Sequence, residues 1–193
     1  MFDNLREDMR RVVQIAGDGA AAVGWRRLIA SARSPGLHAV VAYRYGHWLL
    51  GRPWLLRLLL GLPYHLGAWY VRIGWGIELD RKARIGAGLF IGHFGDIHVG
   101  GGVVLGRRVA ISQGVTIGVA GTGERSGSPV VGDDAYIAPG AKLFGAIRVG
   151  NNVKIGANAV IHCDLPDNAV AALSPGFELI SMRGNRREAT NRC

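Results

Sequence analysis

The stretch VGNNVKIGANAVI, residues 149–161, carries an aliphatic residue at every sixth position: Val149, Ile155 and Ile161. Glycine follows the first two of these residues, and the fifth position of each hexad is small or aliphatic. A short strand that points a side chain inward, followed by a tight turn that needs small residues, accounts for this pattern. Three hexads close one triangular coil, and stacked coils bury a column of aliphatic side chains. The period of six therefore predicts a parallel β-helix.

The same period runs through most of the chain after residue 76. Two phase breaks interrupt it, one of two residues at Ile97-His98 and one of eight residues between Ile117 and Val131. The longer insertion, residues 119–129, is rich in Gly and Ser and should protrude, since insertions in repeat proteins become loops on one face. We expect this loop to reach a neighbouring subunit. The aliphatic positions are Leu79, Ile85, Ile91, Val99, Leu105, Ile111, Ile117, Val131, Ile137, Leu143, Val149, Ile155 and Ile161.

Before residue 76 the apolar spacing is helical. Between Leu37 and Trp48 apolar residues recur at intervals of three and four, and Pro or Gly breaks at residues 34–36, 51–53 and 62–63 divide the region into short helices.

The chain is thus expected to have an α+β fold. We expect a helical N-terminal domain over residues 1–75, a β-helix with a protruding loop over residues 76–177, and a flexible basic tail over residues 178–193. The tail has too few apolar residues to pack.

Composition indicates a folded protein of a reducing compartment. The chain has 193 residues and is 49% hydrophobic, which suffices for a core. Its cysteines, Cys163 and Cys193, lie far apart without CxxC spacing, so neither a disulfide framework nor a zinc site is indicated.

The N-terminus lacks the apolar segment of a secretory signal. The most apolar stretch, residues 54–71, is interrupted by Arg and Pro, whereas a spanning helix needs roughly 20 apolar residues. We expect a cytoplasmic protein.

The net charge of +9 is concentrated outside the repeats. Residues 1–75 hold 10 Arg against 4 acidic residues, whereas residues 76–177 hold 9 basic against 8 acidic residues. A nucleic-acid groove would need a clustered basic face with interleaved aromatic residues in the repeat region, so we expect no nucleic-acid partner. The positive charge of the helical domain has three possible interpretations, which are a solvated surface, a phosphorylated partner and peripheral contact with an anionic membrane.

Several motifs resemble those of the serine acetyltransferases and their sugar-modifying relatives. The resemblance covers nearly the whole chain, and the sequence at residues 91–95, Ile-Gly-His-Phe-Gly, is most similar to polysaccharide-associated members. It implies a left-handed parallel β-helix, acetyl-CoA as cosubstrate, and a homotrimer with active sites between subunits, a dimer of trimers being left open. The matching segments are residues 1–8, 36–39, 43–44, 47–48, 85–93, 113–118 and 154–157.

The resemblance assigns the catalytic residues. Acetyl transfer from a thioester to a hydroxyl needs a base for the hydroxyl proton, a donor to the developing oxyanion, and alignment of both substrates. The family's general base falls on His93, whose neutral imidazole can take up and release a proton. The family's aspartate, which holds that imidazole, falls on Glu78, with Asp80 in reserve. We therefore expect a pair of His93 and Glu78.

The resemblance also assigns the donor site. The pantetheine arm should follow a coil edge, a lysine should lie near the nucleotide phosphates, and a backbone N–H beside the thioester should stabilise the oxyanion. Each residue is equally explained as an ordinary hexad position. The residues assigned are Gly118 and Val119 beside the thioester, Ala138, Pro139 and Ala157 along the arm, and Lys154 near the phosphates.

The acceptor side departs from the serine acetyltransferases. Gly92 stands where they have an aspartate before the base, and Gly127-Ser128 stands where they have an Arg-His pair. The charged groups of an amino acid would lack partners, so we expect a sugar or another small alcohol as acceptor. The candidate acceptor contacts are Gly92, Phe94, Asp96 and Ser128. Two alternatives stay open, namely a serine O-acetyltransferase of cysteine biosynthesis and a non-catalytic solenoid scaffold.

His93 and His98 have the spacing of paired zinc ligands in γ-type carbonic anhydrases, which also contain hexapeptide repeats. Zinc would need a third ligand. Residues 66–92 contain no histidine, and His162 lies many hexads later. We therefore expect no metal at the site, with His98 facing solvent or contacting the acceptor.

Overall fold

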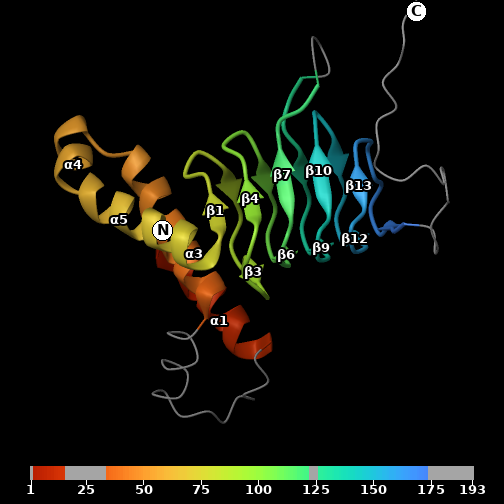
Figure 1. Ribbon diagram of the computed structural model, residues 1–193, viewed down its shortest axis with the longest axis horizontal. Helices are drawn as coiled ribbons and strands as arrows, with labels where there is room; N and C mark the ends of the chain where they lie inside the picture. The colour runs from red at the N-terminus through yellow and green to blue at the C-terminus, as the bar shows by residue number, and fades with distance from the viewer. Residues whose placement is uncertain (1, 16–33, 122–125, 174–193) are drawn as a thin grey trace, which may run out of the picture.

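The computed structural model describes residues 2–15, 34–121 and 126–173, and shows helices at one end of a parallel β-helix (Figure 1). The helices are α1 (Phe2–Ile15), α3 (Pro35–Leu50), α4 (Trp54–Leu59) and α5 (Gly61–Trp75). The strands are β1 (Ile77–Leu79), β2 (Arg84–Ile85), β3 (Phe90–Ile91), β4 (Ile97–Val99), β5 (Val104–Leu105), β6 (Ala110–Ile111), β7 (Thr116–Gly118), β8 (Val130–Val131), β9 (Tyr136–Ile137), β10 (Lys142–Phe144), β11 (Arg148–Val149), β12 (Lys154–Ile155), β13 (Val160–Ile161) and β14 (Val170–Ala171).

The strands form three parallel sheets, one for each side of the solenoid. Sheet A has the order β1-β4-β7-β10-β13, sheet B the order β2-β5-β8-β11, and sheet C the order β3-β6-β9-β12-β14. Up to β13 every third strand therefore stacks on the same side, as expected for three hexads in each coil, whereas β14 stacks on β12. The parallel β-helix predicted from the period of six is confirmed.

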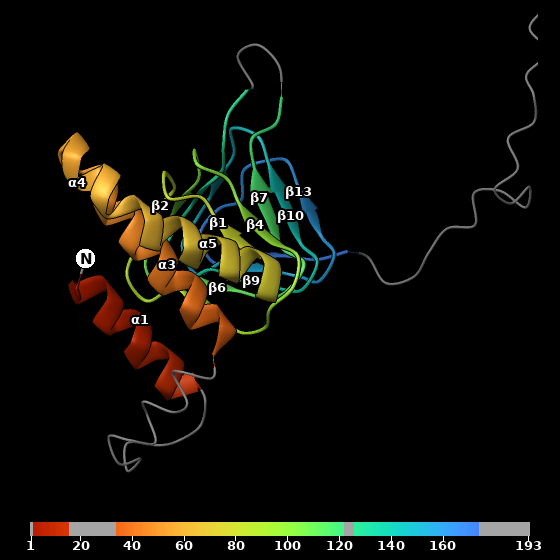
Figure 2. The same cartoon turned by 60° about the vertical axis from the view of Figure 1, so that its left-hand side comes forward.

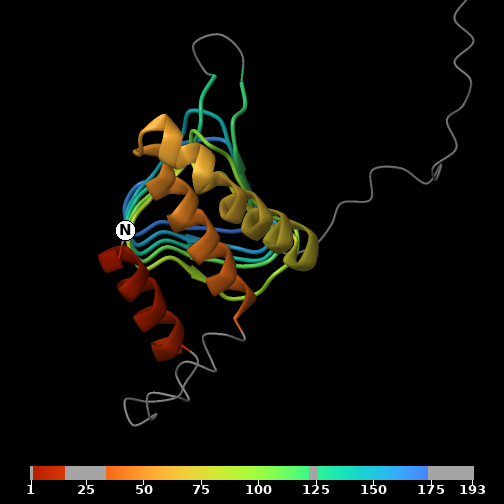
Figure 3. The same ribbon diagram turned by 90° about the vertical axis from the view of Figure 1, so that its left-hand side faces the viewer.

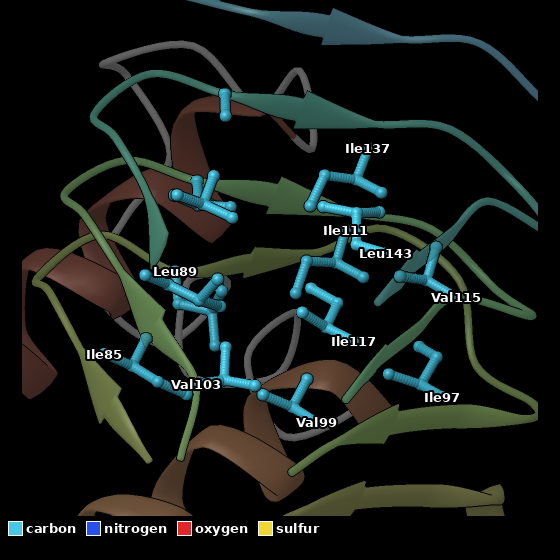
Figure 4. Packing of buried hydrophobic residues seen from close by; sticks show 14 of the residues in the cluster. Ile85, Leu89, Ile97, Val99, Val103, Ile111, Val115, Ile117, Ile137 and Leu143 are labelled. Carbon is cyan, nitrogen blue, oxygen red and sulfur yellow. The ribbon is translucent and has the colours of Figure 1, made fainter. Parts of the chain in front are cut away.

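The aliphatic position of each hexad points into the solenoid and forms its core. Ile117, Ile137, Leu143 and Ile155 are fully buried, and Figure 4 shows side chains from successive coils meeting inside. Burying one such side chain contributes about 1.5–3 kcal/mol relative to exposure, so the column is the main source of stability.

The coil corners carry small residues or residues that tolerate a left-handed backbone. At the corner between sheets B and C, Asp134, Asn152 and Asn168 have positive φ angles of 59°, 53° and 61°. Asp and Asn adopt this conformation more readily than most residues. Their neighbours stack as a ladder, because Asp133 Oδ1 accepts the Arg107 N–H and Asn151 Oδ1 accepts the Asp133 N–H.

Helices α1 and α3 cap the open edge of the first coil, where the backbone groups that face away from the second coil have no preceding coil to pair with. Tyr43 Oη donates to Ala83 O at 2.7 Å and accepts the Ile85 N–H at 3.1 Å. Arg44 donates to Ile85 O and Gly86 O, both at 2.6 Å. An unpaired strand edge is a site of aggregation, so these side chains both dock the helices and protect the edge.

A buried ion pair completes this cap. Asp8 of α1 accepts hydrogen bonds from Arg44 of α3 and from the Gly88 and Leu89 N–H groups. Gly36 lies so close to β3 that an added Cβ would stand 2.5 Å from Ile91 O. The helical motif at residues 36–48 therefore attaches α3 to the first coil.

The last helix leads directly into the solenoid, and the long insertion interrupts the repeats further along the chain. Helix α5 ends at Gly76, which has the left-handed φ of 61°, and β1 follows at once. The described ends of the insertion form an antiparallel bridge between Ala120 and Gly127. Residues 122–125 and the expected tail at 178–193 lie outside the described residues.

Candidate functional site

One edge of the solenoid, where sheet C turns into sheet A, gathers several of the expected site residues. We call it the C–A edge; it consists of the turns after β3, β6, β9 and β12. These turns stack through backbone hydrogen bonds: Gly114 N–H to Gly95 O at 2.8 Å, Gly140 N–H to Gln113 O at 2.9 Å, and Asn158 N–H to Pro139 O at 2.9 Å. The candidate base and the expected pantetheine contacts Ala138, Pro139 and Ala157 therefore lie along one line.

His93 occupies the first turn of the C–A edge and is exposed. The two extra residues of the first phase break lengthen this turn, and Gly95 and Asp96 adopt positive φ angles of 105° and 51°. The helical end supports the turn, because the Phe94 ring packs edge-to-face on Trp75 of α5 with 5.1 Å between centroids. Within the described part of the chain, the His93 imidazole has no hydrogen-bond or ion-pair partner. It is therefore open to a substrate.

Glu78 lies beside His98 and not beside His93. Sheet A pairs Glu78 of β1 with His98 of β4, and Glu78 Oε2 stands 3.6 Å from His98 Nδ1. The same oxygen is 3.7 Å from Arg72 Nε on α5. The expected contact between Glu78 and His93 is not made in this arrangement. Asp80, the reserve carboxylate, accepts the Lys82 N–H at 2.8 Å and serves the turn between β1 and β2.

The expected donor residues divide between two edges. Ala138 is buried, Pro139 is half-buried, and Ala157 is exposed on the C–A edge, with Lys154 exposed on the outer face of sheet C next to it. Gly118, the last residue of β7, and Val119, which follows it, lie at the other end of sheet A, so that roughly 10 Å of strand separates them from the C–A edge. One subunit alone therefore does not bring them to His93.

The expected acceptor residues are divided in the same way. Gly92 lies against the Phe90 ring, because a Cβ added to Gly92 would stand 3.2 Å from a ring carbon of Phe90. The Phe94 ring packs on Trp75. Ser128 lies at the far end of sheet A, where its Oγ is 2.5 Å from an added Cβ on Gly102.

Sequence reasoning missed the partner of Asp96. Lys142 of β10 holds its ammonium 3.9 Å from Asp96 Oδ2, while donating to Gly114 O at 2.7 Å and Thr116 Oγ1 at 2.9 Å. The Asp96 side chain is 89% exposed, so the carboxylate and the ammonium stand together at the turn that carries His93. The sequence could have predicted this contact only from the pairing of β10 with β7, which places Lys142 opposite Thr116. That pairing depends on the exact length of the second insertion.

A second feature that sequence reasoning missed is a pocket of about 560 Å³ between α5, α3 and β1. Tyr64 and Trp69 contribute aromatic walls, and Glu78, Asp80 and Arg81 contribute charges. Burial raises the pKa of the Tyr64 phenol, opposed by the Arg81 guanidinium, which lies 5.0 Å from the ring centroid. His93 does not line this pocket.

No metal centre is found among the residues that the structure describes: no three His, Cys, Asp or Glu side chains come together there. The geometry near His93 offers an imidazole open to solvent, a pair of opposite charges and a row of stacked turns.

Comparisons with known proteins place this geometry among acetyltransferases. A family model described as bacterial transferase hexapeptide (six repeats) matches residues 128–163. A serine acetyltransferase of Helicobacter pylori is 39% identical over 170 residues, which cover 87% of this chain and 92% of the relative. One of Synechococcus elongatus is 36% identical over 178 residues, covering 91% of this chain and 68% of the relative.

A solved structure has the same arrangement of helices and solenoid. It is the serine acetyltransferase of Brucella abortus in complex with coenzyme A, with a TM-score of 0.70 and 28% identity. The match covers 90% of this chain and 65% of that chain, so the present chain spans slightly under two thirds of it.

Proposed function

Because this chain belongs to the serine acetyltransferase family, we propose that it transfers an acetyl group from acetyl-CoA to a hydroxyl group, with His93 as the general base and L-serine as the leading acceptor. The observation that carries the proposal is the exposed His93 imidazole on the same solenoid edge as Ala138, Pro139 and Ala157. A row of stacked turns can hold an extended arm whose thioester ends near the base.

The proposed reaction is a direct transfer. His93 takes the hydroxyl proton as the oxygen attacks the thioester carbonyl carbon, and a tetrahedral oxyanion forms. The C–S bond then breaks, the thiolate receives the proton from the imidazolium, and the ester and free CoA result. Gly118 and Val119 are the proposed oxyanion donors, supplied by a second subunit because they lie at the far end of sheet A. A trimer would supply such a subunit.

Glu78 remains our proposed partner for the protonated His93. Its contacts to His98 and Arg72, at 3.6 and 3.7 Å, are longer than hydrogen bonds, and its side chain is 45% exposed. Such a carboxylate is free to change rotamer, and its negative charge favours the imidazolium at short range.

The comparisons favour L-serine over the sugar acceptor that we expected from the sequence, and serine acetyltransferases over their polysaccharide-associated relatives. Asp96 and Lys142 supply a physical reason, since a carboxylate and an ammonium side by side suit the ammonium and carboxylate of an amino acid. The sequence argument against serine rested on the absence of such partners.

A sugar hydroxyl is the second candidate acceptor. It is favoured by the neutral residues Gly92 and Ser128 at positions where the family has charged ones, and by the exposed Phe94 ring, which could stack on a sugar.

A thiol-release assay with acetyl-CoA separates these acceptors. L-serine, other amino acids and nucleotide sugars are offered in turn to the wild-type chain and to Lys142→Met. We expect turnover with L-serine and a higher KM for serine, at similar kcat, in Lys142→Met. Turnover with a nucleotide sugar alone would support the second candidate. If none of the acceptors gives turnover and acetyl-CoA does not raise the thermal stability of the chain, the scaffold alternative is supported.

A further inference from the structure

Helices α4 and α5 expose an unusual amount of apolar surface. All six residues of α4 are exposed, and Leu58 and Leu59 are 68% and 65% accessible. We call the set the apolar face. Its members are Trp54, Leu55, Leu58, Leu59, Leu62, Leu66, Trp69 and Ile73. Exposed apolar side chains gathered on two consecutive helices mark an interaction site.

The exposed residues of α5 follow a helical stripe. Leu62, Leu66, Trp69 and Ile73 are spaced by four, three and four residues, so they share one side of the helix. The opposite side packs on α3, where Val71 is buried. Helix α5 is therefore apolar on both sides, which is typical of a helix covered on both sides in its working state.

Arginines outnumber acidic residues around this face, although Glu78 lies 3.7 Å from Arg72 at its edge. Residues 34–77 contain no Asp or Glu, whereas Arg52, Arg57 and Arg72 are exposed there. Arg52 also lies over the Trp48 ring, 4.6 Å from its centroid. Trp and Arg beside exposed Leu is the composition of helices that lie in the headgroup region of a bilayer.

We propose that the apolar face of α4 and α5 docks on the surface of an anionic lipid bilayer. Among the described residues no helix has the length and apolarity to cross a membrane, so the helices would lie in the interface plane. Leu and Trp side chains enter the acyl boundary while the arginines contact lipid phosphates.

A second copy of the chain fits this face less well than lipid does. A twofold contact would bring Arg52 and Arg57 of one copy towards the same arginines of the other, and residues 34–77 contain no acidic residue to pair with them, so like charges would face each other. Anionic lipid neutralises the same arginines.

The position of the face suits this orientation. Figures 2 and 3 show α4 and α5 among the helices at one end of the molecule, with the solenoid extending behind them. A membrane at this end therefore does not cover the later coils. The proposal does not depend on acetyl transfer.

Co-sedimentation of the full chain with vesicles tests the proposal. We expect binding to phosphatidylcholine vesicles that contain phosphatidylglycerol, weaker binding to pure phosphatidylcholine, and a loss of binding as salt is raised. Arg57→Gln should lower the partition coefficient by about fivefold, the usual contribution of one arginine near an anionic surface.

Matched variants separate the face from general stickiness. Leu58→Gln/Leu62→Gln/Ile73→Gln should abolish binding, whereas Val160→Gln/Val170→Gln, which changes residues 56% and 73% exposed on the solenoid, should not. Circular dichroism checks that both variants are folded.

Three results would overturn the proposal. The first is a wild-type chain that ignores anionic vesicles, and the second is a triple variant that binds like the wild type. The third is a wild-type oligomer that dissociates in the triple variant on sedimentation velocity without any vesicle binding, because the face is then a contact between copies.

Discussion

Replacing Asp8 by alanine tests how the helices are held on the first coil. The Asp8 side chain is fully buried, and it accepts hydrogen bonds from Arg44 Nε at 2.9 Å and Arg44 Nη2 at 3.2 Å. Its Oδ1 also accepts the Gly88 and Leu89 N–H groups at 2.7 and 2.9 Å. Alanine would leave a guanidinium that is only 4% exposed without its counter-ion, and two backbone donors without an acceptor.

The expected cost follows from those contacts. Removing one partner of a buried ion pair costs about 3–5 kcal/mol, because the other charge stays buried and uncompensated. The two N–H groups add about 1–3 kcal/mol each where water cannot reach them. Arg44 keeps its bonds to Ile85 O and Gly86 O, and water can enter the vacated space, so we expect a total loss of about 4 kcal/mol in the free energy of unfolding.

Urea unfolding followed by tryptophan fluorescence measures this loss. All five tryptophans precede the solenoid in the sequence, and the four that the structure describes, Trp48, Trp54, Trp69 and Trp75, lie on α3, α4 and α5 and report on the helical end. Far-UV circular dichroism on the same samples follows the chain as a whole.

A matched control lies on the same helix. Glu7 makes an exposed contact with Arg10 at 3.6 Å, so Glu7→Gln should cost less than about 0.5 kcal/mol. The apolar pair Asp8→Leu/Arg44→Met should recover only the part of the loss that comes from the uncompensated charge, because the Gly88 and Leu89 N–H groups and the carbonyls bound by Arg44 then stay unpaired. If Asp8→Ala costs no more than Glu7→Gln, the cap does not hold the helices and the reasoning is refuted.

Three further outcomes are expected. His93→Ala should lower kcat by roughly 10²–10⁴-fold with the urea midpoint unchanged, and His162→Ala, an exposed histidine on the last coil, should leave kcat unaltered. Burial raises the pKa of the Tyr43 phenol, so the folded state holds that proton more tightly and stability should fall as pH rises above about 10, a fall that Tyr43→Phe should lessen in alkaline unfolding curves while Tyr64, whose pKa is also raised, keeps its share. Gly36→Ala should lower the thermal midpoint, because its Cβ would stand 2.5 Å from Ile91 O, whereas Gly67→Ala on α5, with nothing within 4 Å, should not.

The fold could be predicted because the repeat determines its own register. An aliphatic residue at every sixth position can be buried in every coil only when three hexads close a turn, as the pairing of Ile111 with Ile137 and of Ile137 with Ile155 confirms. The gathering of Ala138 and Ala157 on one edge follows from the same spacing.

The contacts of Glu78 could not be predicted with the same certainty. The extra residues before β4 shift the pairing, so that sheet register places His98 opposite Glu78 while His93 stands in the preceding turn. The contact of Asp96 with Lys142 likewise joins different coils across an insertion of eight residues. Such pairings depend on loop lengths, which carry no periodic signal.

The turn that carries His93 is built against the helical end as much as against the solenoid. Phe94 packs on Trp75, Gly76 approaches the Asp96 N–H with an added Cβ at 3.1 Å, and Gly36 lies against Ile91. Helices α3 and α5 therefore position the candidate base, although every hexad outside the first coil could stack without them. Helix α5 also carries part of the apolar face. A partner that binds or displaces this helix therefore acts through Trp75 on Phe94, the residue next to His93. The basic helical end is thus better understood as part of the candidate site than as an attachment to it.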